Sequence, residues 1–236
     1  MLDMVLFAVF PYIAVIVAVV VGVYRYFNAR FSYSSYSSQF LETRALFWGS
    51  APWHYGIIVI LLAHLLAALF PDFWAALIAE PGRLYALELV GLALGALALV
   101  AVALLVLRRL GNARIRAVTS PMDWVLLAAL LIQVALGVWV ALFYRWGSAW
   151  YLSSITPWLR SLVALQPQIE AVAVLPLVVK LHALGGFVIL ALFPFTRLVH
   201  AVVPPLGYLW RPHQVVIWNR RAQAGARERR EGVEKA

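Results

Sequence analysis

The sequence predicts an all-α integral membrane protein with five transmembrane helices. Its composition carries this prediction: 64% of the 236 residues are hydrophobic, only 12% are charged, and the mean hydropathy is +0.89. A soluble domain is about half apolar and about a quarter charged. The apolar segments leave no room for a separate water-soluble core. We therefore expect one membrane domain, residues 1–204, followed by a tail, residues 205–236, that contacts a partner.

Five apolar segments are long enough to cross a hydrocarbon core, which needs about 20 residues of helix. The first has no basic region before it and no small-residue cleavage site after it, which favours a retained helix over a signal peptide. Residues 153–165 mix Trp and Leu with polar residues and predict either a short interfacial helix or an ordered loop. The five segments are residues 3–27, 52–71, 84–107, 122–144 and 173–202.

Positive charge is distributed unequally along the chain. Fifteen of the nineteen Lys and Arg residues lie at or beyond the ends of the first, third and fifth segments; the other four are Arg83, Arg145, Arg160 and Lys180. The positive-inside rule then places the N-terminus outside and the C-terminus in the cytoplasm. This clustering explains the net charge of +9. Anionic lipid and a cytoplasmic protein are the expected partners, and no nucleic-acid-binding motif is present.

Cysteine is absent from the chain. Its absence excludes disulfides, an iron–sulfur cluster ligated by this chain, and haem attached through thioether bonds. Any haem bound here is therefore of the b type. Histidine and carboxylate side chains remain possible ligands for another metal, so a metal transporter stays an alternative.

Four of the five histidines lie within the apolar segments, His54 and His64 on the second, His182 and His200 on the fifth. Imidazole is unfavourable in lipid, which favours ligands over hydrogen-bonded structural residues. Because the two segments run in opposite directions, His54 is level with His200, and His64 lies toward His182. Two stacked bis-histidine haems require this arrangement. His213 lies beyond the last segment, and we expect no ligand role for it.

The two histidines of each segment are separated by different distances along the membrane normal. The 18 residues from His182 to His200 make five helical turns, about 27 Å on one face. The 10 residues from His54 to His64 span about 15 Å, with directions that differ by about 80°. Helix tilt, the reach of the side chains and a kink at Pro194 are expected to absorb the difference.

Several short motifs accompany the histidines. They are Phe10-Pro-Tyr-Ile-Ala14, Ser37-Ser-Gln39, Arg108-Arg-Leu110, Arg114-Ile-Arg-Ala117, Leu181-His182, Phe193-Pro-Phe-Thr-Arg-Leu-Val-His200, and Tyr208-Leu209 with Arg211 and Gln214. With these flanks and the spacings of 10 and 18, the chain resembles the gamma subunit of membrane-bound respiratory nitrate reductase over about residues 10–219. That subunit is a dihaem cytochrome b membrane anchor.

The resemblance implies a haem pair and an electron route. His64 and His182 would hold a distal haem at the outer side, and His54 and His200 a proximal haem at the inner side. Quinol would be oxidised near the distal haem. Electrons would pass to an iron–sulfur (beta) subunit and on to a molybdenum (alpha) subunit that reduces nitrate, so this chain has no catalytic residue for nitrate. An equivalent subunit of a sulfite-reductase-linked or heterodisulfide-reductase-like complex is the alternative.

Quinol binding in the family involves a lysine at the outer start of the third helix. In this chain Tyr85 occupies that position and Arg83 lies two residues before it, so the lysine has no counterpart. Arg83 is a candidate substitute donor or an arginine that reaches to lipid phosphate. Glu88, an ionisable group in apolar surroundings, is a candidate for passing protons outward or a hydrogen-bonded packing residue.

Haem propionates are negatively charged and need cationic partners when they are partly buried. Lys180 is the candidate at the distal haem; the alternative is that it reaches to the lipid headgroups. Arg114 and Arg116 are candidates at the proximal haem. The alternative is that they only contribute to the positive charge that orients the protein in the membrane.

Overall fold

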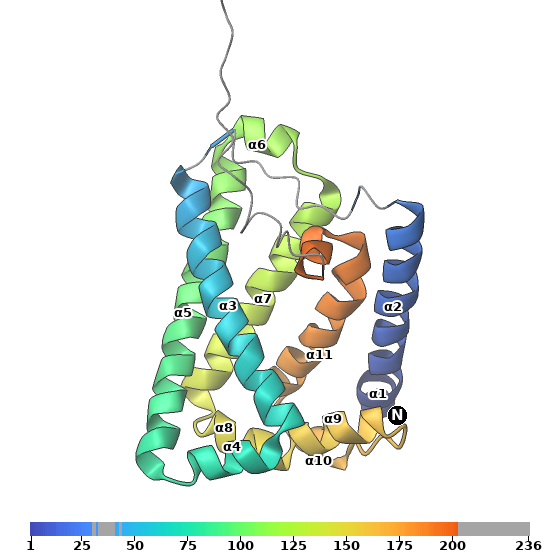
Figure 1. Ribbon diagram of the computed structural model, residues 1–236, viewed down its shortest axis with the longest axis vertical. Helices are drawn as coiled ribbons and strands as arrows, with labels where there is room; N and C mark the ends of the chain where they lie inside the picture. The colour runs from blue at the N-terminus through green and yellow to red at the C-terminus, as the bar shows by residue number, and fades with distance from the viewer. Residues whose placement is uncertain (30–31, 33–40, 43, 203–236) are drawn as a thin grey trace, which may run out of the picture. The chain divides into compact units, whose positions relative to one another are not determined.

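The computed structural model describes residues 1–29, 32, 41–42 and 44–202, which all fall within the unit Met1–Val203. The described residues are mostly helical and contain no strand (Figure 1). The predicted tail, residues 205–236, lies outside them. In chain order the helices are α1 (Leu2–Met4), η1 (Val5–Val9), α2 (Phe10–Asn28), α3 (Arg44–Leu69), α4 (Pro71–Ile78), α5 (Pro81–Gly111), α6 (Ala113–Ala117), α7 (Pro121–Phe143), α8 (Gly147–Ser153), α9 (Ile155–Val163), α10 (Glu170–Ala173), α11 (Leu177–Leu192), η3 (Phe193–Phe195) and η4 (Arg197–Ala201).

Five stretches of the described chain are long and apolar enough to cross a membrane, which confirms the five predicted spans. They are Leu2–Asn28, Arg44–Leu69, Pro81–Gly111, Pro121–Phe143 and Leu177–Phe195. The large apolar side chains on their outer faces are exposed, as a surface that meets lipid requires. Examples are Ile16, Val20, Leu62, Leu89, Val100 and Ile132.

The second span begins earlier than its hydropathy predicts. Its helix, α3, starts at Arg44, and Pro52 lies inside it rather than at its start. The carboxylate of Glu42 accepts hydrogen bonds from the backbone N–H groups of Ala45 and Leu46 at 2.7 and 3.1 Å. These bonds satisfy the first turn, so the helix extends beyond the apolar stretch.

The last span ends differently from the prediction of one helix over residues 173–202. The α-helix stops at Leu192, and the chain continues through two 3-10 turns, η3 and η4. Pro194 lacks the N–H that an α-helix needs, so the backbone breaks here instead of bending. His200 therefore lies in η4, and the distance calculated along a continuous helix does not apply to it.

The spans pack as a chain of neighbours. α3 packs along α5, α5 along α7, α7 along α11, and α11 along α2. Gly56 permits the close approach of α3 to α5, since a Cβ there would lie 3.2 Å from the carbonyl oxygen of Leu94. Within the described residues, α11 is not a close neighbour of α3. The two histidine-bearing elements are therefore held by α5 and α7 rather than by each other.

Short helices gather at one end of the bundle, and α6 lies at the opposite end (Figure 1). We call these the α9 end and the α6 end. At the α9 end, α9 confirms the predicted short helix in residues 153–165. Its Trp158 is 1% exposed and donates a hydrogen bond from Nε1 to the carbonyl of Phe7 at 2.8 Å. This helix therefore packs against the first span.

Basic residues differ between the two ends of the described chain. The α6 end carries more of them, as the distribution along the sequence predicts. Those at the α6 end are Arg25, Arg44, Arg108, Arg109, Arg114, Arg116 and Arg197; those at the α9 end are Arg83, Arg145, Arg160 and Lys180.

Candidate functional site: two histidine pairs

The four histidines predicted as ligands, His54, His64, His182 and His200, share one hydrogen-bonding arrangement. Each ring places Nδ1 at hydrogen-bond distance from a backbone carbonyl oxygen. The pairs are His54 with Ser50 at 2.7 Å, His64 with Ile60 at 2.8 Å, His182 with Gln133 at 3.1 Å, and His200 with Arg197 at 2.5 Å. A carbonyl only accepts, so Nδ1 donates in every case and Nε2 keeps its lone pair. Metal-ligating histidines are typically oriented in this way.

The α6-end pair consists of His54 on α3 and His200 on η4. Their ring centroids lie 6.0 Å apart, and the ring planes are inclined by 68°. Two imidazoles that bind one metal ion from opposite sides have centroids about 6 Å apart, because each metal–nitrogen bond is about 2 Å and each centroid lies about 1 Å further. The distance between these rings therefore fits axial ligation of a single haem iron.

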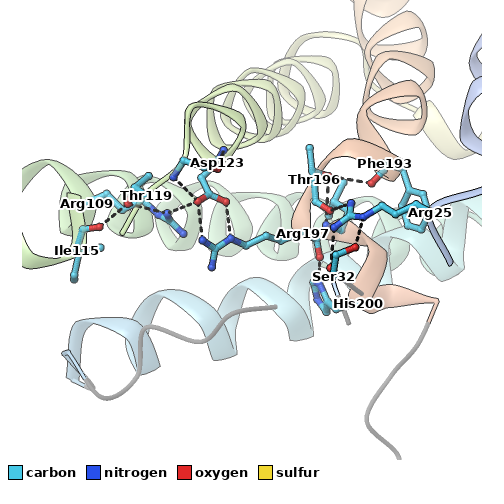
Figure 2. Close-up of polar contacts among 12 residues, drawn as sticks. Arg25, Ser32, Arg109, Ile115, Thr119, Asp123, Phe193, Thr196, Arg197 and His200 are labelled. Carbon is cyan, nitrogen blue, oxygen red and sulfur yellow. Dashed lines mark hydrogen bonds and ion pairs between the residues drawn. The ribbon is translucent and has the colours of Figure 1, made fainter. Parts of the chain in front are cut away.

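A buried carboxylate lies beside the segment that carries His200. Asp123, at the start of α7, is 4% exposed. Arg197 binds it through two nitrogens, Nε to Oδ1 at 2.6 Å and Nη2 to Oδ2 at 2.8 Å. Arg109 of α5 lies 3.8 Å from Oδ2, and the N–H of Ser120 donates to the same oxygen at 2.9 Å. Figure 2 shows this cluster and its connection to His200.

The same segment is held on its other side by Arg25 of α2. The guanidinium donates from Nη1 to the carbonyl of Pro194 at 2.6 Å and to that of Thr196 at 3.3 Å. Nε of Arg25 also donates to Ser32 Oγ at 2.8 Å (Figure 2). The chain after the helix break therefore has partners on α2 and α7.

The α9-end pair consists of His64 on α3 and His182 on α11. His182 and Gln133 exchange hydrogen bonds: the imidazole donates to the Gln133 carbonyl, and Gln133 Nε2 donates to the His182 carbonyl at 2.9 Å. Gly137 lies against this ring, since a Cβ there would be 2.9 Å from His182 Cε1. The close packing of α7 against α11 therefore fixes the imidazole.

His64 contacts an aromatic residue of α8. The rings of His64 and Tyr151 meet edge to face with centroids 5.7 Å apart, and the Tyr151 hydroxyl donates to the His64 carbonyl at 3.3 Å. Burial raises the pKa of Tyr151 to about 12. The phenol therefore stays protonated, and remains a donor, throughout the physiological range.

A groove of about 320 Å³ opens at the same end. Of the three residues predicted to bind quinol, Tyr85 and Glu88 line it and Arg83 does not; Arg145 does. Glu88 accepts a hydrogen bond from the backbone N–H of Ser148 at 2.7 Å, which stabilises the first turn of α8. Arg83 instead donates to the carbonyl of Ala76 at 3.3 Å, joining the start of α5 to α4.

Comparison with known proteins assigns the family. A family model described as nitrate reductase gamma subunit matches residues 3–219. The chain belongs to this family. It is 33% identical over 215 residues to the nitrate reductase gamma chain of Bacillus subtilis (strain 168), covering 89% of this chain and 96% of that one. It is 33% identical over 221 residues to the respiratory nitrate reductase 2 gamma chain of Escherichia coli (strain K12), covering 91% and 96%.

A longer relative contains a similar region. The nitrate reductase-like protein NarX of Mycobacterium tuberculosis (strain ATCC 25618 / H37Rv) is 32% identical over 229 residues, which make up 95% of this chain and 35% of that protein. The resemblance predicted from short motifs is thus confirmed at the level of the nitrate reductase gamma subunit family.

Two of the three cationic residues predicted to bind propionates, Lys180 and Arg116, have partners within the chain of this gamma-subunit family member. Lys180 Nζ lies 3.5 Å from Asp3 Oδ1, an ion pair that links α11 to the N-terminal helix. Arg116 donates to the carbonyl of Leu110 at 2.6 Å. The side chains of Arg114 and Arg116 are exposed on α6. Their role toward propionates stays a prediction.

Four residues of the site were not predicted from the sequence: Asp123, Arg197, Gln133 and Tyr151. The Ser120-Pro-Met-Asp123 segment carries a capping-box signal at a helix start, which indicates a structural carboxylate. Gln133 is a polar residue in the middle of an apolar span, a position that by itself predicts a functional or packing role. Tyr151 has no such signal, because its contact with His64 depends on how α8 folds back.

Proposed function

We propose that this gamma-subunit family member is the quinol-oxidising dihaem cytochrome b subunit of a membrane-bound nitrate reductase. The α6-end pair carries the proposal: His54 and His200 combine a 6.0 Å ring separation with Nδ1 atoms held by carbonyls. His64 and His182 have the same Nδ1 arrangement and would hold the second haem. When bound, the haems would supply one-electron carriers between quinol at one face and an acceptor subunit at the other.

The donor set favours haem over a metal ion bound by protein ligands alone. Among the described residues, no group of three or more His, Asp or Glu side chains converges on a point that could hold a metal. A haem needs only two axial ligands from the protein, since the porphyrin provides the other four. The pairs therefore support a cytochrome, whereas a divalent-metal transporter would need a larger ligand set.

The charge distribution supports one orientation. With the α6 end in the cytoplasm, the excess of arginine lies on the side that the positive-inside rule requires. The N-terminus is then outside, and the tail, residues 205–236, is expected to contact an iron–sulfur (beta) subunit that precedes a molybdenum (alpha) subunit. The setting is the cytoplasmic membrane, with anionic lipid around the arginines.

Quinol would be oxidised at the outer α9 end. There Tyr85, Glu88 and Arg145 line the groove. Ser148 donates to Glu88 Oε1, and the second carboxylate oxygen is suited to accept a proton from a quinol hydroxyl. Helix α8 connects this groove to the distal pair, because it is capped by Glu88 and carries Tyr151 against His64. Protons would leave on the outside while electrons move inward.

The decisive experiment measures haem in the purified membrane complex. A reduced-minus-oxidised absorption spectrum and pyridine haemochrome quantification should give two b-type haems per chain, reducible by a short-chain quinol. Bound metal without haem would overturn the proposal. Co-purification with the subunits of another reductase would indicate that the terminal acceptor is not nitrate. Glu88→Gln should slow quinol-driven haem reduction; an unchanged rate would remove its proton role.

A further inference from the structure

We infer that Asp123 is a positioning residue for His200, acting through Arg197. The inference rests on the proposed function, because it takes His200 to be a haem ligand. Asp123 does not touch the imidazole. It fixes the 3-10 turn that presents the ring at the α6 end.

The first link is the ion pair between Asp123 and Arg197. The carboxylate is buried, and two parallel nitrogen–oxygen contacts of 2.6 and 2.8 Å join it to the guanidinium. A two-point contact of this kind fixes the orientation of the arginine as well as its distance. The N–H of Ser120 and the guanidinium of Arg109 hold the carboxylate itself. The position of Arg197 is thereby tied to the start of α7.

The second link runs through the backbone of Arg197. Its carbonyl oxygen accepts the hydrogen bond from His200 Nδ1 at 2.5 Å. One residue thus carries both the side chain that Asp123 holds and the acceptor that orients the imidazole. A change in the ion pair is transmitted to the histidine through a single peptide unit.

This support is needed because His200 lies outside regular helix. His54 and His64 donate to carbonyls four residues earlier within α3, an acceptor position that the α-helix itself fixes. His182 lies within α11 and donates to the neighbouring α7. The η4 turn has only five residues and follows the break at Pro194, so its own backbone bonds hold it less firmly.

The segment after the helix break is also held by Arg25, at a point before Arg197. Arg25 donates to the carbonyls of Pro194 and Thr196, which fixes the start of the segment from the side of α2. Asp123 fixes Arg197 from the side of α7, as Figure 2 shows. Loss of Asp123 would remove the ion pair that ties Arg197, and with it the carbonyl that orients His200, to the start of α7.

The expected consequence is a change in the proximal haem and not in the distal one. The relative orientation of two axial imidazoles governs the ferric low-spin EPR signal, and nearby charge and hydrogen bonding set the reduction potential. Asp123→Asn removes the negative charge that faces Arg109 and Arg197. The remaining positive charge favours the reduced haem, so the midpoint potential should shift upward.

The test is potentiometric titration and EPR spectroscopy of the intact complex. The proximal signal is assigned as the one lost in His200→Ala. Asp123→Asn should change its EPR g values and raise its potential, and Asp123→Glu should restore part of both. The matched control is Glu42→Gln, which removes a carboxylate paired with Arg108 at 2.7 Å at the same end, but with no bond to a carbonyl that orients a histidine. It should leave the g values unchanged.

Unchanged g values in Asp123→Asn would overturn the inference while leaving the dihaem proposal intact. Loss of the proximal haem alone supports it when Asp123→Glu restores that haem. Loss of both haems in both variants overturns it in favour of a role in folding. If the native complex holds no haem that depends on His200, the proposed function fails instead.

Discussion

The two histidine pairs are built by different means. At the α6 end, one ligand leaves regular helix and is held by buried ion pairs around Asp123. At the α9 end, both ligands lie within regular helices, and neutral hydrogen bonds and close packing hold them. The first pair should therefore respond to changes in charge and the second to changes in shape.

The difference follows from the backbone. Pro194 ends α11 before His200 is reached, so that ligand needs partners outside its own helix. His182 lies early in α11, where the helix is intact and α7 is packed beside it. Removing one partner of a buried ion pair is strongly destabilising, whereas the complete pair holds its side chains in one geometry.

The largest effect is expected from removing one ligand of either pair. His200→Ala and His182→Ala should each reduce haem content to one per chain, the former losing the proximal and the latter the distal haem. Pyridine haemochrome quantification with EPR spectroscopy distinguishes the two. His213→Ala is the control, because this histidine lies in the basic tail outside the described residues and has no predicted ligand role. Loss of both haems from either variant would show that the pairs do not bind independently.

Gly137→Ala should disturb the distal pair by shape alone. The added methyl group would lie 2.9 Å from His182 Cε1, so the ring or α7 must move, and overpacking typically costs about 1–3 kcal/mol. The distal EPR signal should change and thermal stability should fall. Gly91→Ala is the matched control: nothing lies within 4 Å of its Cβ, and alanine favours helix by up to about 1 kcal/mol. Equal behaviour of the two variants would contradict the packing argument.

Gln133→Leu should change the orientation of His182 at the α9 end with little effect on the stability of the protein. The amide Nε2 donates to the His182 carbonyl, while Oε1 is buried without a hydrogen-bond partner among the described residues. Replacing the amide loses one bond but also removes an unsatisfied oxygen, so stability should change by less than about 1 kcal/mol. The distal EPR signal should change and the proximal one should not. A large loss of stability with an unchanged signal would contradict this assignment.

The sequence predicted the helical class, the five spans and the family. These follow from long-range composition and from a few motifs, which do not depend on side-chain packing. The start of α3 was missed because Glu42, a polar residue before the apolar stretch, caps the helix. The end of α11 was missed because a proline within an apolar segment is compatible with either a kink or a break.

The site was predicted less completely than the fold. The histidines are conspicuous in an apolar segment, whereas Asp123 and Arg197 are 74 residues apart and meet only when α7 and η4 are packed. Trp158 shows the same limit. A tryptophan near the end of a span suggests an interfacial anchor, but this one is buried against Phe7. Proximity between distant segments has no local signal in the sequence.

The smallest effect is expected on stability, from two helix-capping carboxylates, one at each end of the bundle, as the pH falls. Hydrogen bonding from Arg108 and the Ala45 N–H lowers the pKa of Glu42 below its ordinary value at the α6 end, and bonds from the N–H groups of Gly82 and Arg83 lower the pKa of Glu80 at the α9 end. A lowered pKa in the folded state stabilises the protein above the unfolded value, and this stabilisation disappears as pH falls through the folded value.

Glu42→Gln and Glu80→Gln should therefore each lower the melting temperature near neutral pH, and their difference from the native protein should vanish in acid. Thermal melts of the detergent-solubilised protein from about pH 7 to about pH 2 measure this. Because Glu42 faces a buried guanidinium and Glu80 is bonded by backbone N–H groups, the larger difference is expected at the α6 end. A difference that is constant with pH would mean that the carboxylate charge contributes nothing at that end.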